Sequence, residues 1–158
     1  MTTPEDLTVT VREGRPELDE QLSGLLDVVN TARTAPLPAA RELTVAVHDA
    51  GGDLVAGLSG WTWAEAAGIA MTWVHEERRG QALGTRLLAE FEAEAVRRGV
   101  LRVFVTSFTF QAPGFYERHG YREIFRWEGV PVAGQDDVHL RKELVARPRN
   151  DEVSGGAS

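Results

Sequence analysis

The spacing of apolar residues along the chain predicts alternating strands and helices. Apolar residues at every second position, or in a short run, are typical of strands, and apolar residues three and four apart are typical of amphipathic helices. On these criteria we expect strands at residues 7–11, 43–48, 54–63, 69–74, 100–106, 121–127 and 138–144. We expect helices from Pro16 to about Ala32, from Leu83 to the C-cap Gly99, and from Pro113 to His119.

The order of these elements defines the expected fold class. A glycine-rich turn at residues 49–53 joins two strands as a hairpin, a third strand follows, and a strand–helix–strand unit comes next. We therefore expect a single α/β (mixed α+β) domain with a central, mixed, mostly antiparallel sheet of six to seven strands flanked by helices. The domain is expected to span residues 1–145, and residues 146–158 are expected to be a flexible C-terminal tail.

Composition and charge narrow the class of protein. The chain has 158 residues, 17 basic and 24 acidic, and a net charge of -7, which disfavours nucleic acid as a partner. It has no cysteine, which excludes disulfides and thiolate metal ligands. It has no apolar run of the roughly 18 residues that a membrane span needs, and no apolar secretory signal at its N-terminus. We expect a soluble, cytoplasmic protein.

The segment Trp73–Leu88 places a buried strand, a turn rich in arginine and glycine, and a helix start in succession. Such a turn directs free backbone N–H groups and the positive end of a helix dipole at one point, which suits a pyrophosphate. Gly80 and Gly84 are expected to let the ligand approach the backbone, and Arg78 and Arg79 to add positive charge. The segment lacks the Gly-Lys-Ser/Thr that ends a Walker P-loop. It also lacks the G-x-G-x-x-G spacing of a dinucleotide-binding turn. An ordinary strand–turn–helix with solvated arginines is the alternative.

A second segment, Ser107–Ile124, contains Phe115-Tyr116-Glu117 followed by Gly120-Tyr121. Together with Arg79-x-x-Ala82-x-Gly84, these residues make the chain resemble the GNAT superfamily of acyl-CoA-dependent N-acyltransferases over roughly residues 8–144. The resemblance implies an N-acetyltransferase that moves an acetyl group directly from acetyl-CoA to a primary amine of a small molecule or peptide. It implies acetyl-CoA as co-substrate and no metal.

The resemblance assigns acetyl-CoA binding to the strand end, the loop and the first helical turn of the first segment. The residues are Trp73, Val74, Arg79, Gly80, Gln81, Ala82, Leu83, Gly84 and Thr85, together with Gln111. Two positions depart from the family pattern. Ala82 replaces the first glycine of the loop, where a methyl group is tolerable if the residue is already helical. Phe110 replaces an asparagine of many relatives, and Gln111 either supplies the lost hydrogen bond to pantetheine or faces solvent.

The chemistry of acetyl transfer suggests roles for residues in both segments. Tyr116 is the candidate general acid, because a phenol with a reference pKa near ~10 can protonate a thiolate whose conjugate acid is nearer ~8.5. A core tyrosine is the alternative. The resemblance also points to a backbone N–H of Trp73 or Val74 as the donor that stabilises the oxyanion. The same strand end would pair with the pantetheine amides if the neighbouring strand splays away.

Deprotonation of the acceptor amine has several candidate bases. The strand at residues 69–74 contains no carboxylate, so a protein-borne base comes from elsewhere. Glu65, His75, Asp136 and Asp137 are open choices, of which Glu65 and Asp136 are retained as candidate acceptor-site residues. A water chain, or an acceptor already partly neutral, would need no dedicated base.

The pair Trp61 and Trp63 is a candidate wall of the acceptor pocket. The two residues are two apart on one predicted strand, so their side chains face the same side of the sheet. They either offer a cation–π surface to a charged amine or pack in the core. The segments 34–42 and 128–137 are expected to carry acceptor specificity.

Other functions remain open from the sequence alone. Ala82 and the missing central carboxylate also fit a non-catalytic acyl-CoA-binding sensor or partner subunit, and the turn also fits another phosphate ligand in an unrelated enzyme. We expect the partner to be a small-molecule or peptide amine, with no nucleic acid and no membrane. A homodimer is compatible with the sheet edge that the late strands would offer.

Overall fold

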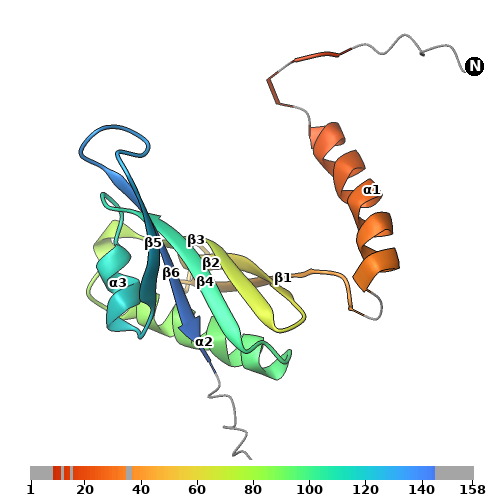
Figure 1. Cartoon of the computed structure of the whole chain (residues 1–158). Coiled ribbons are helices and arrows are strands. Elements are labelled where there is room, and N and C mark those ends of the chain that lie inside the picture. The colour runs from red at the N-terminus through yellow and green to blue at the C-terminus, as the bar shows by residue number, and fades with distance from the viewer. Residues whose placement is uncertain (1–8, 12, 15, 35–36, 145–158) are drawn as a thin grey trace, which may run out of the picture. The chain divides into compact units, whose positions relative to one another are not determined.

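The structure is a computed structural model that describes residues 9–11, 13–14, 16–34 and 37–144. Its helices are α1 (Pro16–Thr34), the 3-10 turn η1 (Glu76–Arg78), α2 (Leu83–Arg97) and α3 (Pro113–Arg118). Its strands are β1 (Arg41–His48), β2 (Leu54–Trp63), β3 (Ala66–Val74), β4 (Arg102–Phe108), β5 (Arg122–Glu128) and β6 (Asp136–Glu143). Figure 1 shows these elements.

The first predicted strand is the one element that differs in kind. Residues 9–11 form no strand, and residues 7 and 8 lie outside the described part of the chain. Alternation over so few residues indicates β-propensity, but a strand also needs a neighbouring strand to pair with. The expected tail at residues 146–158 also lies outside the described residues, and the domain bounds 1–145 stay a prediction.

Helix α1 belongs to a compact unit of its own, residues 1–39, and the sheet belongs to the unit of residues 40–158. The helix begins at Pro16, whose fixed φ and missing N–H suit a first helical turn. Glu17 and Asp19 lie in that turn and Arg33 in the last one, the charge order that the helix dipole favours. No helix in the described ranges has the length and hydropathy that a membrane crossing requires.

The sheet has six strands in the order β1-β2-β3-β4-β6-β5. Every neighbouring pair is antiparallel except β3 and β4, which are parallel because α2 connects them as a crossover helix. Helix α2 contacts β1, β2 and β3, and α3 contacts β4, β5 and β6. The predicted mixed, mostly antiparallel sheet flanked by helices is therefore confirmed, with six strands.

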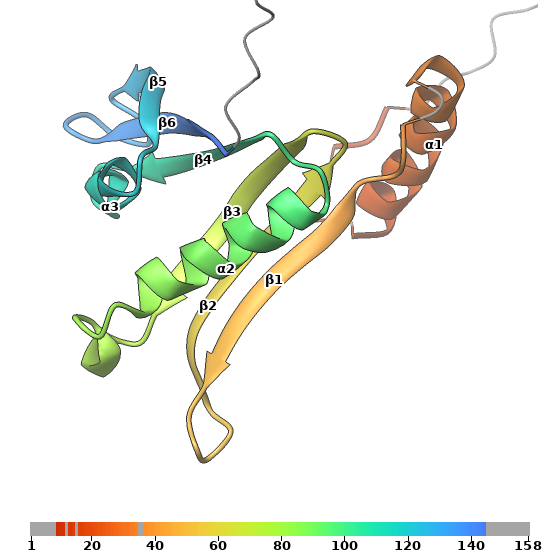
Figure 2. The same ribbon diagram turned by 90° about the horizontal axis from the view of Figure 1, so that it is seen from below.

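The parallel pair β3–β4 opens part way along its length. Pairing ends at Ile69 and Val105, although β3 continues to Val74 and β4 to Phe108. The β2–β3 register changes directly after Ile69, leaving Ala70 unpaired as a β-bulge, which bends a strand. Beyond the bulge β3 stays with β2 while β4 stays with β6, so the sheet divides into two halves, as Figure 2 shows.

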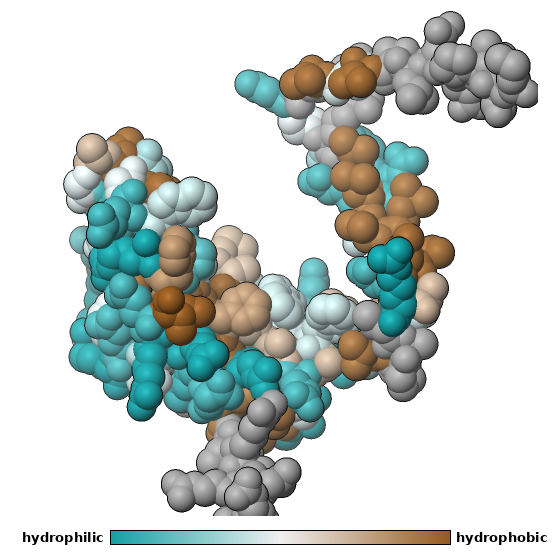
Figure 3. Space-filling model, viewed as in Figure 1, coloured by the Kyte–Doolittle hydropathy of each residue, from teal (hydrophilic) through white to brown (hydrophobic). Residues whose placement is uncertain are grey.

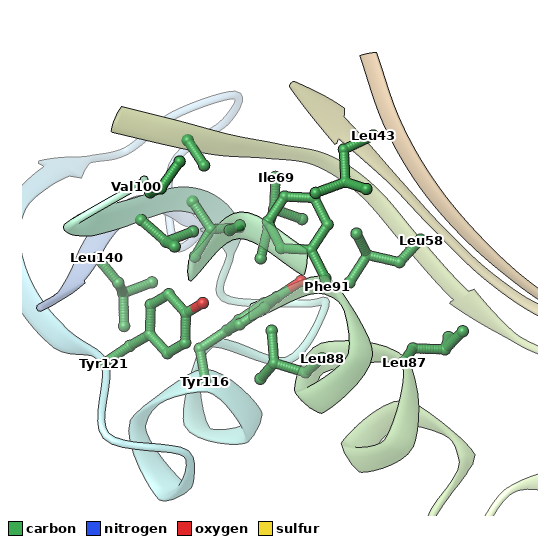
Figure 4. Packing of buried hydrophobic residues seen from close by; sticks show 14 of the residues in the cluster. Leu43, Leu58, Ile69, Leu87, Leu88, Phe91, Val100, Tyr116, Tyr121 and Leu140 are labelled. Atoms are coloured by element: carbon green, nitrogen blue, oxygen red, sulfur yellow. The ribbon is translucent and has the colours of Figure 1, made fainter. Parts of the chain in front are cut away.

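The core lies between α2 and the sheet. The buried residues of α2 are Leu87, Leu88, Phe91 and Ala95. Their spacing of three and four places them on one helix face, as the sequence pattern predicted. Figure 4 shows this cluster, which Tyr116 and Tyr121 join from the α3 end. The core therefore fixes α2 and α3 beside the open end of β3 and β4.

Candidate active site

A cleft of about 960 Å³ lies where β3 and β4 diverge. Its walls come from the unpaired end of β3, the loop and first turn of α2, the end of β4 and helix α3. It gathers most of the predicted site residues, namely Trp73, Val74, Arg79, Gly80, Ala82, Leu83, Gly84, Thr85, Gln111 and Tyr116. Gln81 is exposed and is not among the lining residues. Two motifs far apart in the sequence thus share one cleft.

The backbone of β3 presents unpaired polar groups to the cleft. The His75 N–H donates to the carbonyl of Val55 on β2 at 2.9 Å. In an antiparallel pair, every second residue directs its backbone groups at the partner strand, so Trp73 also faces β2. Thr72 and Val74 therefore direct theirs away from β2, toward the space that β4 has left. Sequence reasoning named Trp73 and Val74 but missed Thr72, because pairing register is a tertiary property.

The loop before α2 begins with a small helical turn that is capped by a side chain. His75 is the N-cap residue of η1, and its Nδ1 accepts a hydrogen bond from the Glu77 N–H at 3.3 Å. The loop ends at Ala82, the N-cap residue of α2, with φ 56° and ψ 20°. Ala82 is thus left-handed, and the condition under which its methyl group was expected to be tolerable does not hold. The methyl group strains a conformation that the family glycine adopts freely.

Ala82→Gly is expected to stabilise the protein, because glycine adopts the left-handed conformation without the Cβ clash. The gain should be about 1 kcal/mol in the free energy of unfolding. Urea denaturation of both proteins measures it, and acetyl-CoA titration should show affinity at least equal to the parent. Ala64→Gly is the matched control for the affinity measurement. Ala64 also has positive φ (48°) but lies outside the cleft, so its replacement should stabilise the protein and leave acetyl-CoA affinity unchanged. An Ala82→Gly variant less stable than the parent would contradict the strain.

Gly84 lies where two helices pack closely. A Cβ at this position would lie 3.3 Å from the Phe115 ring, which is tight for a side-chain contact. Glycine here therefore lets α2 and α3 approach each other, whereas sequence reasoning linked it to ligand approach. Next to it, the Thr85 hydroxyl lies 2.9 Å from His119 Nε2, and His119 Nδ1 lies 2.7 Å from the Phe115 carbonyl. The carbonyl can only accept, so Nδ1 carries the proton, and in the neutral imidazole Thr85 donates to Nε2.

The start of α2 has the charge of an anion site. Its first turn contains no acidic residue, and its first backbone N–H groups have no partner within the helix. Arg78, Arg79 and Arg118 line the same cleft. Arg118 was not singled out from the sequence, because only the fold brings α3 beside this loop. Positive charge, free N–H groups and the helix dipole thus coincide at one end of the cleft.

Tyr116 lies on α3 with its side chain at the opening between the strands. The residue is 7% exposed, and its hydroxyl donates to Thr72 Oγ1 of β3 at 3.1 Å. Burial raises the pKa of Tyr116, and the hydrogen bond with Thr72 opposes this only in part. The phenol therefore stays protonated at neutral pH. The rings of Phe115 and Tyr121 pack edge-on against it at 5.1 and 5.6 Å between centroids.

Phe110 and Gln111 lie in the turn that follows β4. The Gln111 side-chain oxygen accepts a hydrogen bond from the Phe108 N–H at 3.1 Å, which leaves its NH₂ group to donate. Phe110 stacks on Phe108 with centroids 5.2 Å apart, and both Gln111 and Phe110 line the cleft. Gln111 is exposed, and its hydrogen bond to pantetheine in place of the family asparagine stays a prediction.

The predicted acceptor-site residues Trp61, Trp63 and Glu65 lie elsewhere. Trp61 and Trp63 pair with the first residues of β3, at the opposite end from the cleft. Trp61 packs on Phe104, with ring centroids 5.3 Å apart. Glu65 lies 4.0 Å from Arg102 in an exposed ion pair. Their role in acceptor binding stays a prediction that this geometry does not support.

Asp136 lies on the β5–β6 hairpin and has its own partners. Its carboxylate accepts hydrogen bonds from Arg126 at 2.9 Å and from the Gly129 N–H at 3.1 Å. The Arg126 guanidinium, aided by Gly129, holds the pKa of Asp136 below its usual range. Such a carboxylate is a weak base, and it does not line the cleft. Within the described residues, no three His, Asp or Glu side chains gather as a metal site would require.

Comparison with known proteins identifies the family. Residues 39–123 match the acetyltransferase (GNAT) domain family. The chain is 41% identical to a blasticidin-S acetyltransferase of Streptomyces morookaense over 57% of its length and 69% of that protein. It is 30% identical to an acetyltransferase of Agrobacterium fabrum over 66% of its length and 75% of that protein.

A solved structure extends the likeness over the fold. A putative acetyltransferase from Agrobacterium tumefaciens superposes with a TM-score of 0.78 at 26% identity, covering 87% of this chain and 98% of that one. The chain therefore belongs to the GNAT family of acetyltransferases, a class of acyl-CoA-dependent enzymes.

Proposed function

We propose that the protein is an N-acetyltransferase that moves an acetyl group from acetyl-CoA to a primary amine of a small molecule or peptide by direct transfer. One observation carries the proposal. The protonated hydroxyl of Tyr116 lies in the cleft beside Thr72, at the strand end whose backbone groups have lost their partner strand. A proton donor and backbone N–H donors thus converge where a thioester would react.

The residues of the cleft fit acetyl-CoA. The first turn of α2 with Arg79 would hold the pyrophosphate through backbone N–H groups and charge. The exposed backbone edge of Val74 and the Gln111 amide would bind the pantetheine amides, because the divergence of β4 leaves room for a short added strand. When bound, acetyl-CoA supplies the acetyl group and the thiolate leaving group.

Two groups of the chain would act on the reacting thioester. The backbone N–H of Thr72, on the same residue whose hydroxyl binds Tyr116, would stabilise the oxyanion. Tyr116 would give its phenolic proton to the leaving thiolate, and its raised pKa keeps that proton available at neutral pH. Thr72 therefore supplies the backbone N–H and also positions the Tyr116 hydroxyl, so the oxyanion and the thiolate would both lie beside Thr72.

The relative that acetylates blasticidin S, by its name, suggests the first acceptor to test. The assay measures thiol release from acetyl-CoA with blasticidin S, an aminoglycoside, spermidine and a lysine peptide. Calorimetric titration of acetyl-CoA, with ATP and desulfo-CoA as comparators, measures binding separately. Release with at least one amine supports the enzyme. Binding without release from any amine would favour an acyl-CoA-binding sensor, and no binding would overturn the site.

Thr72→Val tests the hydrogen bond that positions Tyr116. Valine keeps the shape of the side chain but removes the acceptor of the Tyr116 hydroxyl. We expect kcat to fall about tenfold, the cost of roughly one positioned hydrogen bond, with the acetyl-CoA Kd unchanged. Thr44→Val, on an exposed site of β1, is the control and should retain full activity. Equal kcat for Thr72→Val and Thr44→Val would show that Thr72 does not position the acid.

A further inference from the structure

A second hollow, of about 250 Å³, adjoins the cleft at β4 on the other face of the sheet. Thr106 lines both the cleft and this hollow. It lies beyond the last β3–β4 pair, where the sheet is open. The cleft and the hollow therefore share Thr106, at the point where β4 has parted from β3. Figure 3 shows apolar side chains among polar ones over β4 to β6.

The strand next to Thr106 carries a histidine and a carboxylate on that face. His139 pairs with Thr106 across the β4–β6 ladder and lines the hollow, and Asp137 pairs with Phe108. Val138 and Leu140, which alternate with them, are fully buried in the core. Because successive strand residues point to opposite faces, His139 and Asp137 face away from the core.

His139 and Asp137 form an ordered pair. His139 Nε2 lies 3.0 Å from Asp137 Oδ2, and a carboxylate only accepts, so Nε2 carries the proton. The other ring nitrogen, Nδ1, is therefore an unprotonated acceptor in the neutral imidazole, and it has no hydrogen-bond partner in the part of the chain that the structure describes. The Phe125 ring packs edge-on against the imidazole at 5.4 Å between centroids.

The charges around the pair come from three strands. Arg141 of β6 and Arg102 of β4 line the same hollow, and Arg122 of β5 pairs with Arg141 in the ladder. Arg102 lies within 4.0 Å of two carboxylates, those of Glu65 and Glu143, which balance its charge. Asp137 is the carboxylate in contact with His139 itself.

The geometry points to His139 as the base that takes a proton from the acceptor amine, with Asp137 as its positioning residue, and this inference rests on the proposed function. One proton of the ammonium group passes to His139 Nδ1. The amine lone pair then forms the N–C bond, the C–S bond breaks, and Tyr116 protonates the thiolate. The second proton lost from nitrogen returns to Tyr116 through solvent, and His139 releases its proton to solvent, so one proton is produced per turnover.

The other candidate bases have different positions or partners. His75 uses Nδ1 to cap η1, and Asp136 is bound by Arg126. Glu65 directly precedes β3, at the end far from the cleft. Among the bases considered from the sequence, only Asp137 belongs to this site, and it acts through His139. The sequence did not single out His139, since only the register places it beside Thr106.

The test uses His139→Gln and Asp137→Asn in the full chain, with His48→Gln at the end of β1 as the matched control. The acceptor is the compound among blasticidin S, aminoglycoside, spermidine and lysine peptide that the parent turns over fastest. At pH 7 we expect kcat/KM for the acceptor to fall about 100-fold in His139→Gln and about tenfold in Asp137→Asn. The acetyl-CoA Kd and the control should be unchanged.

The pH dependence separates a base from a structural residue. A primary amine deprotonates itself near pH ~10, so the difference between His139→Gln and the parent should shrink as pH approaches that value. A loss of constant size at every pH, or activity within twofold of the parent at pH 7, would overturn the inference. If His139→Gln fails to fold by thermal melting, Asp137→Asn decides by the same pH comparison. A parent that releases no thiol with any acceptor would overturn the proposed function as well.

Discussion

Tyr116→Phe is expected to lower kcat by about 10²- to 10⁴-fold, the range that a positioned general acid contributes. The substitution removes only the hydroxyl that binds Thr72 and leaves the ring among Phe115 and Tyr121. Acetyl-CoA affinity should change little, because the expected binding groups are backbone N–H groups and Arg79. Steady-state thiol release measures kcat, and calorimetric titration measures the Kd.

Tyr121→Phe is the matched control for this prediction. Tyr121 is also a buried tyrosine, 2% exposed and in ring contact with Tyr116, but it does not line the cleft. It should therefore keep kcat within a few-fold of the parent. If Tyr116→Phe retained the activity of Tyr121→Phe, the thiolate would be protonated by another group, and the phenol would have only a packing role.

Phe91→Ala is expected to destabilise the fold by about 3–5 kcal/mol, because it removes a large side chain from a closed core. Phe91 is fully buried in the middle of α2. Its ring faces β2 at Gly60, where a Cβ would come within 3.1 Å of the ring and would overlap the Gly68 carbonyl oxygen. The backbone of β2 thus packs directly on the ring, and its pairing with β1 and β3 opposes a movement that would fill the space.

Urea denaturation followed by circular dichroism measures this change. Val96→Ala on the same helix is the control, since Val96 is 44% exposed and should cost less than about 0.5 kcal/mol. A loss below about 1.5 kcal/mol for Phe91→Ala would show that α2 repacks on the sheet. That outcome would also weaken the placement of the α2 N-terminus at the cleft.

Most elements could be predicted from the sequence because their patterns are local. The apolar residues Leu87, Leu88, Phe91 and Ala95 of α2 recur at helical spacing, and the structure buries them in the core, with Leu83 partly buried against it. The hairpin at residues 49–53 and the short helix before Gly120 follow from glycine and proline positions. The boundaries of β4 shifted from 100–106 to Arg102–Phe108, because pairing with β6, and not side-chain pattern, determines where a strand ends.

The site could be predicted only in part. Ala82 was found from its place in the motif, but its left-handed backbone became visible only in the structure. Gly84 was predicted to let the ligand approach the loop, yet in the structure it lies against Phe115 of another helix. Trp61 and Trp63 share a sheet face, but position along the strand placed them away from the cleft.

The sequence by itself determined the family, most of the elements and the two motifs that meet in the cleft, because residue type and local spacing carry those signals. Only the tertiary structure decided which groups face one another. The bulge at Ala70 ends the β3–β4 pairing and opens the cleft. The packing of α3 on the open sheet places Tyr116 beside Thr72, and the ladder register places His139 beside Thr106. Register depends on contacts between residues distant in the chain, and a shift of one residue would turn each side chain to the other face.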